Sequence, residues 1–402
     1  MPERDNLRRS GSRCPRWSKA CRMSTMPDPD AVARSRGQLP VLHWFTNIAA
    51  PYRVPVWEHI AGQADLTVFL LESDRQRVRE GRRPADWSQR GLRGLRHRTL
   101  RTLKLRRGET SLYTLLDLQF ALTRKPSAVL LGGWESPAYW QLLLVAKLRR
   151  IRTVGFYEST LNTNRHRSGV IARARSLFMR SLDAVVVPGA DAEAALKSFG
   201  VAAERIHRGF NAVDVQYIAD RARSVRASDQ ESRGHRFIFV GQLISRKQPA
   251  LLLEAFAKVR GPDDVLVFVG DGPERSLLEE CVRTMGLSEH VTLTGTTEND
   301  AAIDEMIASD TLVLPSSEEV WGLVVNEGLA AGLHAVVTES SGVAASTKHM
   351  RGVYTCAPDL GSLAEALVAS KSNWRGHISA PEILEHTPAA FASVFLGALD
   401  ER

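Results

Sequence analysis

The chain has 402 residues, of which 44% are hydrophobic and 24% are charged, and its formal net charge is +8. This length is too great for one ordinary core and predicts two domains of roughly 150–200 residues each. No apolar run reaches the roughly 18–20 residues that span a bilayer, so we expect no transmembrane helix, and the arginines at the start argue against a secretory signal. The excess positive charge is compatible with binding to nucleic acid, anionic lipid or a phosphorylated substrate, and net charge alone does not distinguish these partners.

Residues 1–38 carry arginine, proline and serine with almost no apolar periodicity, and we expect a disordered basic tail. A true start at Met23 or Met26 is an open alternative. The cysteines form no C-x2-C pair, which favours reduced thiols in a cytoplasmic protein and predicts no metal site. They are Cys14, Cys21, Cys281 and Cys356.

The segment 39–214 is predicted to be the first domain. It begins with an apolar strand over 40–45, a helix over about 54–62 and a second strand over 66–71. Strand, helix and strand in this order form a βαβ unit and imply a parallel sheet. Because ligands bind at the carboxyl ends of parallel strands, we expect the loop 46–53 to face the ligand.

Residues 75–107 hold 13 lysines and arginines against two acidic residues, a net +11 that exceeds the charge of the whole chain. We expect a mobile basic flap beside the ligand-facing loop, able to attract a phosphorylated, lipid-linked molecule or an anionic bilayer at the inner membrane face. A solvated basic loop without a partner is the equally weighted alternative. The segment lacks alternating aromatic residues and does not suit nucleic acid.

Strands and helices continue to alternate along the chain, as two doubly wound sheets require. The polar stretch 215–235 is expected to be a linker, 236–385 a second domain, and 386–402 a C-terminal helix that crosses back to the first domain. Strands are predicted over 127–133, 153–157, 184–189, 236–241, 265–269 and 291–295, and helices over 137–149, 168–180, 247–259, 274–285, 300–309 and 388–399.

The stretch 312–337 is predicted to be a buried strand, a loop, a short helix and a second buried strand. The loop carries Glu319, and Gly322 is expected to begin the helix, whose free amides then suit a phosphate. Glu327 follows just over one turn later and can lean over the same pocket toward a ribose. Two carboxylates beside one anion site fit a nucleotide-sugar, whereas an isolated pair with this spacing is more often two surface glutamates.

The run EVWGLVVNE over 319–327 resembles the E-x7-E signature of retaining GT-B glycosyltransferases of family 4, the glycosyl transferases group 1. The flanking LPS at 314–316 and AAG at 330–332 also resemble the family pattern. Gly328 and His334 depart from the usual alanine and proline, and neither change removes a charged contact.

The resemblance is strong over about 236–356 and moderate over 40–214. It implies the GT-B fold, in which two Rossmann-like doubly wound α/β domains face each other across a cleft. It also implies a hexosyltransferase-type enzyme that moves a sugar, with retention, from a nucleotide-sugar donor to a glycan or lipid-linked acceptor in cell-surface polysaccharide biosynthesis. No metal or other cofactor is expected. The sequence does not specify the base, the sugar, the acceptor or the oligomeric state.

The resemblance assigns residues to the donor site. The family places an arginine, and a lysine five residues later, after the first strand of the second domain. Here Lys247 matches the lysine, while Gln242 replaces the arginine and Arg246 is a substitute charge. The implied catalytic residues are Lys247, Glu319 and Glu158. The implied donor-binding residues are Gln242, Arg246, Lys247, Gly295, Glu319, Gly322, Leu323, Val324 and Glu327.

On the acceptor side, the run TNxxxPYR over 46–53 resembles the first loop of family-4 transferases in polysaccharide assembly. This resemblance makes Asn47, Tyr52 and Arg53 the implied acceptor contacts, with a loop cap and a solvated arginine as the alternative. Glu158 stands where the family usually has a histidine, and its carboxylate can accept a hydrogen bond or a proton from an acceptor hydroxyl.

Two other functions stay open at this stage. A nucleotide-sugar epimerase shares the two-domain fold but lacks this E-x7-E context, and it would release epimerised sugar without an acceptor. A non-catalytic nucleotide-sugar-binding module is suggested by Gln242 and Glu158, and it would bind the donor without hydrolysis or transfer.

Overall fold

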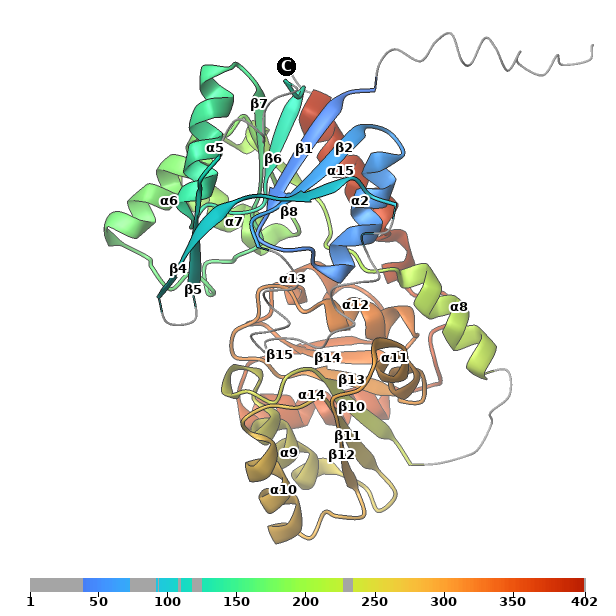
Figure 1. The fold of residues 1–402 in the computed structure, drawn as a ribbon. Helices are drawn as coiled ribbons and strands as arrows, with labels where there is room; N and C mark the ends of the chain where they lie inside the picture. The colour runs from blue at the N-terminus through green and yellow to red at the C-terminus, as the bar shows by residue number, and fades with distance from the viewer. Residues whose placement is uncertain are drawn as a thin grey trace, which may run out of the picture. The chain divides into compact units, whose positions relative to one another are not determined.

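The computed structural model describes residues 39–72, 92, 94–107, 110–117, 125–226 and 234–400. The predicted tail over 1–38 lies outside these ranges. From Pro40 onward the chain forms one compact unit that contains two large parallel sheets, one blue to green and one yellow to red in Figure 1.

The first sheet has the strand order β3-β2-β1-β6-β7-β8-β9, with every neighbouring pair parallel. Its chain order reverses between β1 and β6, as in a doubly wound sheet. Apolar runs such as AVLL in β6 and AVVV in β8 are buried throughout, because a parallel sheet is covered on both faces. The strands are β1 Val41–Thr46, β2 Asp65–Leu70, β3 His97–Thr99, β6 Ala128–Leu131, β7 Arg152–Phe156, β8 Ala184–Val187 and β9 Ile206–Arg208.

Helices cover both faces of the first sheet (Figure 1). Three helices bury their apolar sides in one core cluster, and two others, α2 and α15, do so in a second cluster across the sheet. The helices of the first cluster are α5 Pro137–Leu148, α6 Gly169–Ser181 and α7 Ala190–Ser198, and those of the second are α2 Val54–Ala61 and α15 Pro388–Asp400.

The second sheet has the order β12-β11-β10-β13-β14-β15, again all parallel, with its reversal between β10 and β13. The predicted α/β fold with two Rossmann-like doubly wound domains is therefore confirmed. The strands are β10 Arg236–Val240, β11 Val265–Val269, β12 Val291–Gly295, β13 Thr311–Leu314, β14 His334–Thr338 and β15 Val353–Cys356. The helices are α9 Pro249–Val259, α10 Arg275–Thr284, α11 Asn299–Ile307, α12 Leu323–Ala330, α13 Ala344–Thr347 and α14 Leu360–Ser372.

The expected linker over 215–235 contains a helix instead, α8 Val215–Arg226. Its buried residues Val215, Ile218 and Ala222 belong to the same core cluster as strands β10, β13 and β14. The helix is amphipathic, and the Arg226 guanidinium at its end donates to the carbonyls of Ile307 and Ala331, so this part of the stretch packs on the second domain.

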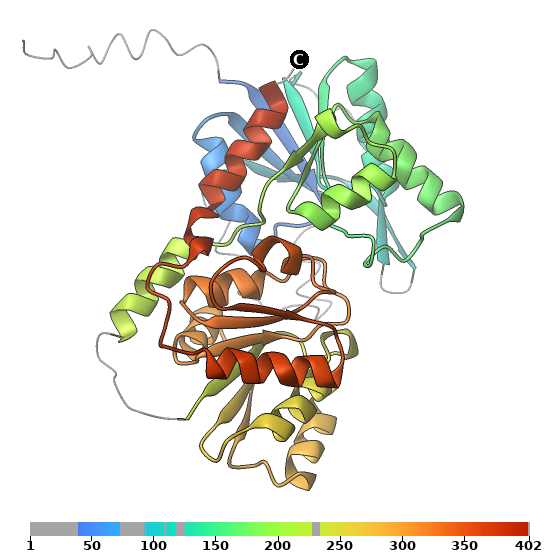
Figure 2. The same cartoon turned by 180° about the vertical axis from the view of Figure 1, so that it is seen from behind.

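The C-terminal helix α15 packs on the first sheet, against α2 (Figure 2). The Phe395 ring lies 4.7 Å from that of Trp44 in β1 and 5.5 Å from that of Phe156 in β7. The three rings are buried in one cluster, which joins the end of the chain to its first strand.

The segment expected to be a mobile basic flap is in part regular structure. Residues 97–99 form β3, which pairs with β2, and β4 Thr102–Arg107 pairs antiparallel with β5 Thr110–Leu115. Within the described residues, the prediction of a flap is therefore wrong for 97–107, because β3 pairs with β2 and β4 pairs with β5, whose Tyr113 and Leu115 are buried against α5. The rest of that segment, apart from Leu92 and 94–96, lies outside the described residues.

Within the described ranges, no helix is long and apolar enough to cross a membrane.

Candidate functional site

The predicted donor residues gather where the second sheet reverses its strand order. β10 ends at Val240 and β13 at Leu314, and these strands are neighbours. The loop after β10 carries Lys247, and the loop after β13 carries Glu319. Diverging loops at such a switch point leave room for a ligand beyond the carboxyl ends of the strands.

Two cations meet one carboxylate at this point. Lys247 Nζ lies 3.3 Å and Arg246 Nη1 lies 3.4 Å from Oε2 of Glu319. The Lys247 and Glu319 side chains are 15% and 13% exposed, whereas that of Arg246 is 44% exposed. The loops are also tied by their backbones, since the Ser317 amide donates to the Arg246 carbonyl at 2.8 Å. Lys247 is therefore held in place, and Arg246 stands at the solvent edge.

Gly322 fixes the start of helix α12, as the sequence predicts. It caps the helix with φ 102°, a conformation that residues with a side chain rarely adopt. A Cβ atom there would lie 2.6 Å from Cδ2 of Leu314. The first amides of α12, on Leu323 and Val324, have no partner inside the helix and carry its positive dipole end.

Glu327 lies on α12 and is half-buried. Burial raises the pKa of its carboxyl to about 7, while the charge of Lys247 opposes part of that rise. Lys247 is thus near both glutamates, and the structure brings together Lys247, Glu319, Gly322 and Glu327 as the sequence led us to expect.

Gln242 and Gly295 lie on two further loops of this sheet edge. Gln242 is exposed, directly after β10. Gly295 ends β12 with φ 77°, and a Cβ atom there would lie 3.0 Å from Nη1 of Arg275. Sequence reasoning missed Arg275, a further cation at this edge that lies shortly after the run GDGP at 270–273. Its guanidinium also donates to Oε1 of Glu279 at 2.8 Å.

The predicted acceptor residues lie at the carboxyl ends of β1 and β7. Asn47 Oδ1 accepts a hydrogen bond from the Tyr139 hydroxyl at 2.8 Å. Arg53 Nη2 lies 2.9 Å from Oε1 of Glu158, and its guanidinium covers the ring of Phe156 at 4.1 Å and that of Tyr52 at 5.2 Å.

The Arg53 side chain is only 8% exposed, and its buried Nη1 has no hydrogen-bond partner within the described part of the chain. Burial by itself lowers the pKa of Arg53, but the charge of Glu158 and the contact with Tyr52 raise it more, so the net shift is upward. The expected alternative of a solvated arginine does not fit this geometry.

Glu158 is held from a second side. Asn211 Nδ2 donates to the same Oε1 at 3.0 Å. The Asn211 carbonyl in turn accepts a hydrogen bond from Asn326 Nδ2 at 2.6 Å, and Asn326 Oδ1 accepts one from Trp321 Nε1 at 3.1 Å. Trp321 and Asn326 lie inside the E-x7-E run, so a buried polar chain connects it to Glu158. Sequence reasoning did not identify these positioning residues.

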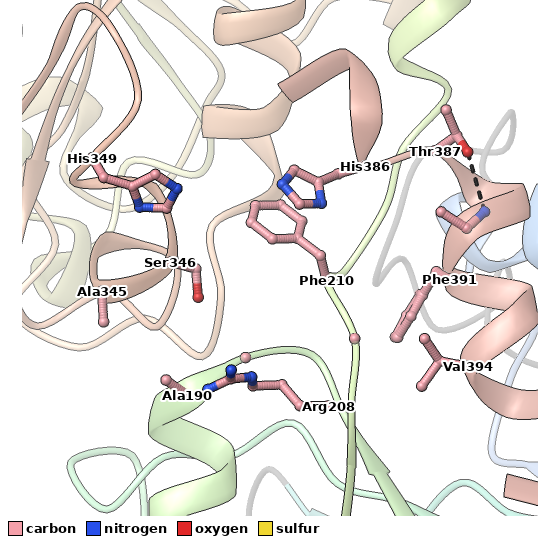
Figure 3. A pocket seen from close by; sticks show the side chains of 13 residues that line it. Ala190, Arg208, Phe210, Ala345, Ser346, His349, His386, Thr387, Phe391 and Val394 are labelled. Carbon is pink, nitrogen blue, oxygen red and sulfur yellow. Dashed lines mark hydrogen bonds between the residues drawn. The ribbon is translucent and has the colours of Figure 1, made fainter. Parts of the chain in front are cut away.

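A pocket of about 450 Å³ is lined by Phe210 and His386, among others (Figure 3). The Phe210 ring stacks on His386 at 3.8 Å and meets Trp321 edge-on at 5.0 Å. Arg208, Ser346 and His349 also line the pocket. None of the predicted donor or acceptor residues is part of its lining.

Within the described ranges there is no group of three or more His, Cys, Asp or Glu side chains that could hold a metal ion. Cys281 and Cys356 are free thiols. The other two cysteines lie in the undescribed segment.

Comparison with known proteins gives one family match, over residues 220–373, to the model described as Glycosyl transferases group 1. Among curated proteins, the sulfoquinovosyl transferase SQD2 of Arabidopsis thaliana is 31% identical over 169 residues, which is 41% of this chain and 32% of that protein. The chain spans roughly a third of the length of the first curated relatives it matches, with shares of 32%, 39% and 38%.

Solved structures match along most of the chain. HepE of Anabaena in complex with UDP has a TM-score of 0.61 at 15% identity, covering 90% of this chain and 95% of that chain. The apo form of WaaB, a lipopolysaccharide outer core galactosyltransferase, has a TM-score of 0.65 at 12% identity, covering 89% and 98%. At such low identity these likenesses establish the fold, which is the GT-B fold of glycosyltransferases.

Proposed function

We propose that this protein is a retaining glycosyltransferase of family 4. It moves a sugar from a nucleotide-sugar to a glycan or lipid-linked acceptor in the assembly of a cell-surface polysaccharide. The observation that carries the proposal is the cluster of Lys247, Glu319 and Glu327 around the N-terminus of α12, at the switch point of the second sheet. The family match over 220–373 covers this whole cluster.

The proposed roles follow from charge and position. Lys247, aided by Arg246 and the amides of Leu323 and Val324, stabilises the diphosphate charge that grows as the sugar leaves. Glu319, whose carboxylate pairs with Lys247, binds hydroxyl groups of the donor sugar. The remaining donor residues have smaller roles: Glu327 binds the ribose, Gln242 donates a neutral hydrogen bond to phosphate, Gly322 lets the diphosphate approach, and Gly295 borders the base.

On the acceptor side, Glu158 acts as an anchor for Arg53 more than as a base, because its Oε1 already accepts hydrogen bonds from Arg53 and Asn211. Arg53 supplies a fixed positive charge beside the predicted acceptor loop, because Glu158 holds its guanidinium. Asn47 and Tyr52 flank the same loop. The departing phosphate then takes the acceptor proton, and no metal or cofactor is assigned to the reaction.

UDP-sugars are the first donors to test, because the HepE structures are complexes with UDP, with UDP and glucose, and with UDP-glucose. The protein is incubated with each UDP-sugar and a lipid-linked acceptor fraction. Release of UDP is measured, and the anomeric configuration of the product is read by proton NMR. Acceptor-dependent UDP release with a retained anomer supports the proposal.

Lys247→Met is expected to lower the rate at least about tenfold, because it removes a charged contact to the diphosphate. The matched control is Lys258→Met, an exposed lysine of helix α9, which is expected to leave the rate unchanged. An inverted product, or epimerised sugar released without acceptor, would contradict the proposal.

A further inference from the structure

The β4–β5 hairpin has two unlike faces. On one face Tyr113 and Leu115 are buried in the core cluster that contains α5. The Leu115 backbone exchanges two hydrogen bonds with the Gln141 side chain of α5, at 2.9 and 3.3 Å. On the other face strand alternation places Leu103 and Leu105, which are 62% and 66% exposed.

The exposed leucines stand among basic residues. The stretch 94–107 contains six lysines and arginines and no aspartate or glutamate. Arg98 and Arg101 are exposed and precede the two leucines in sequence. Exposed apolar side chains beside guanidinium groups match an anionic bilayer surface, where leucines enter the acyl boundary and arginines meet lipid phosphates.

Glu72 ties the hairpin to the loop that carries Asn47. Its carboxylate accepts a hydrogen bond from the Tyr113 hydroxyl at 2.6 Å and forms an ion pair with Lys104 of β4. Its amide donates to the Asn47 carbonyl at 3.0 Å. Thr102 adds a hydrogen bond to the Leu71 carbonyl at 3.0 Å. The hairpin and the predicted acceptor loop are therefore fixed to each other through one buried residue.

We propose that the outer face of the β4–β5 hairpin, Leu103 and Leu105 with their neighbouring arginines, docks on an anionic lipid bilayer. Docking there holds the loop with Asn47 at the membrane surface, where a lipid-linked acceptor is presented. The identity of the acceptor rests on the proposed glycosyltransferase function, whereas the docking itself does not.

The test is flotation of the full chain with vesicles of phosphatidylcholine alone or mixed with phosphatidylglycerol. The wild type is expected to float with the mixed vesicles, and the bound fraction is expected to fall as the salt concentration is raised. With vesicles of phosphatidylcholine alone, the protein is expected to remain at the bottom of the gradient. Leu103→Ser with Leu105→Ser is expected to weaken partitioning at least about tenfold. Arg98→Gln with Arg101→Gln is expected to weaken binding to the anionic vesicles specifically.

The matched control is Leu277→Ser with Val368→Ser, two exposed apolar residues of the second domain, at 54% and 46%. Thermal melting of every variant checks that each remains folded. The proposal is overturned if the wild type does not bind anionic vesicles, or if the control loses as much binding as the leucine variant of the hairpin. It is also overturned if the leucines hold two copies of the chain together in solution. Vesicle binding without sugar transfer from any nucleotide-sugar would contradict the proposed function but would still support docking of the hairpin on the bilayer.

Discussion

Asn326 Nδ2 donates a hydrogen bond to the backbone carbonyl of Asn211 at 2.6 Å, although the two residues are 115 positions apart. Asn326 is fully buried and lies directly before Glu327 in α12. Asn211 holds Glu158 with its side chain. This contact therefore connects the proposed donor helix with the acceptor side of the first sheet.

Replacing Asn326 with leucine is expected to destabilise the fold by about 2–4 kcal/mol. The change removes a buried donor and acceptor at once and leaves the Asn211 carbonyl and Trp321 Nε1 unpaired. Urea unfolding gives the free energy. In a cycle with Trp321→Phe the two losses are expected to be less than additive, because both variants break the same hydrogen bond. Fully additive losses would mean that the chain of contacts is not a unit.

Glu158→Gln is expected to cost about 2–4 kcal/mol, because it leaves the buried Arg53 guanidinium without a counter-charge. The double variant Arg53→Met with Glu158→Gln is expected to lose less than the sum of the single changes, since no unpaired charge is then buried. Chemical denaturation of the three variants measures this. A Glu158→Gln variant as stable as wild type would show that the ion pair does not hold the acceptor side.

The stability of the protein is expected to depend on the Glu327 proton. Burial raises the pKa of this carboxyl from 4.5 to about 7, so the folded chain keeps the proton over a range in which the unfolded chain has lost it. Its stabilising contribution is complete below about pH 4.5 and is lost as the pH rises through about 7. Glu327→Gln has no carboxyl to titrate and therefore avoids this loss. Its free energy of unfolding is expected to exceed that of wild type by up to about 3 kcal/mol as the pH is raised from 5 to 8.

Unfolding experiments at several pH values test this expectation. The exposed Glu365→Gln on helix α14 is the matched control and is expected to follow wild type. Lys247 lowers the pKa of Glu327, so Lys247→Met is expected to raise that pKa. The loss of stability is then expected to occur at a higher pH than in wild type. A Glu327→Gln variant whose pH profile runs parallel to that of wild type would contradict the assignment.

Gly322→Ala and Gly397→Ala are expected to change stability in opposite directions. At Gly322 the positive φ and the contact with Leu314 predict a loss of about 1–3 kcal/mol and a distorted helix start. Gly397 lies inside helix α15 with nothing within 4 Å of an added Cβ, so alanine there is expected to add about 0.5–1 kcal/mol. Melting curves of both variants test this prediction, and equal changes in stability would contradict it.

The sequence predicted regular elements where one residue pattern dominates. The apolar run of β8 and the start of α12 after Gly322 agree with the structure to within about two residues. Helix α8 was missed, because its buried residues are few among arginines, although the spacing of Val215, Ile218 and Ala222 carries the helical period. The hairpin was hidden in the same way, since arginines obscure the alternation of Leu103 and Leu105.

The candidate site was predictable where its residues are close in sequence and share a motif, as Glu319 and Glu327 do. The pairing of Lys247 with Glu319 depended on the family resemblance and on two neighbouring strands of one sheet. Contacts that join remote segments, such as Asn326 with Asn211, leave no local pattern. They depend on how two separate cores pack, which only the folded chain reveals.

The most direct test of the central claim is a calorimetric titration of UDP, GDP, ADP and CMP into wild type, Glu327→Ala and Lys247→Met at one salt concentration. We expect one nucleotide to bind wild type, and to bind Lys247→Met about 10–100-fold more weakly, because a charged contact to phosphate is lost. Glu327→Ala is expected to bind the same nucleotide more weakly through loss of the ribose contact. No binding by any nucleotide, or equal affinity in all three proteins, would contradict a donor site at this edge of the second sheet.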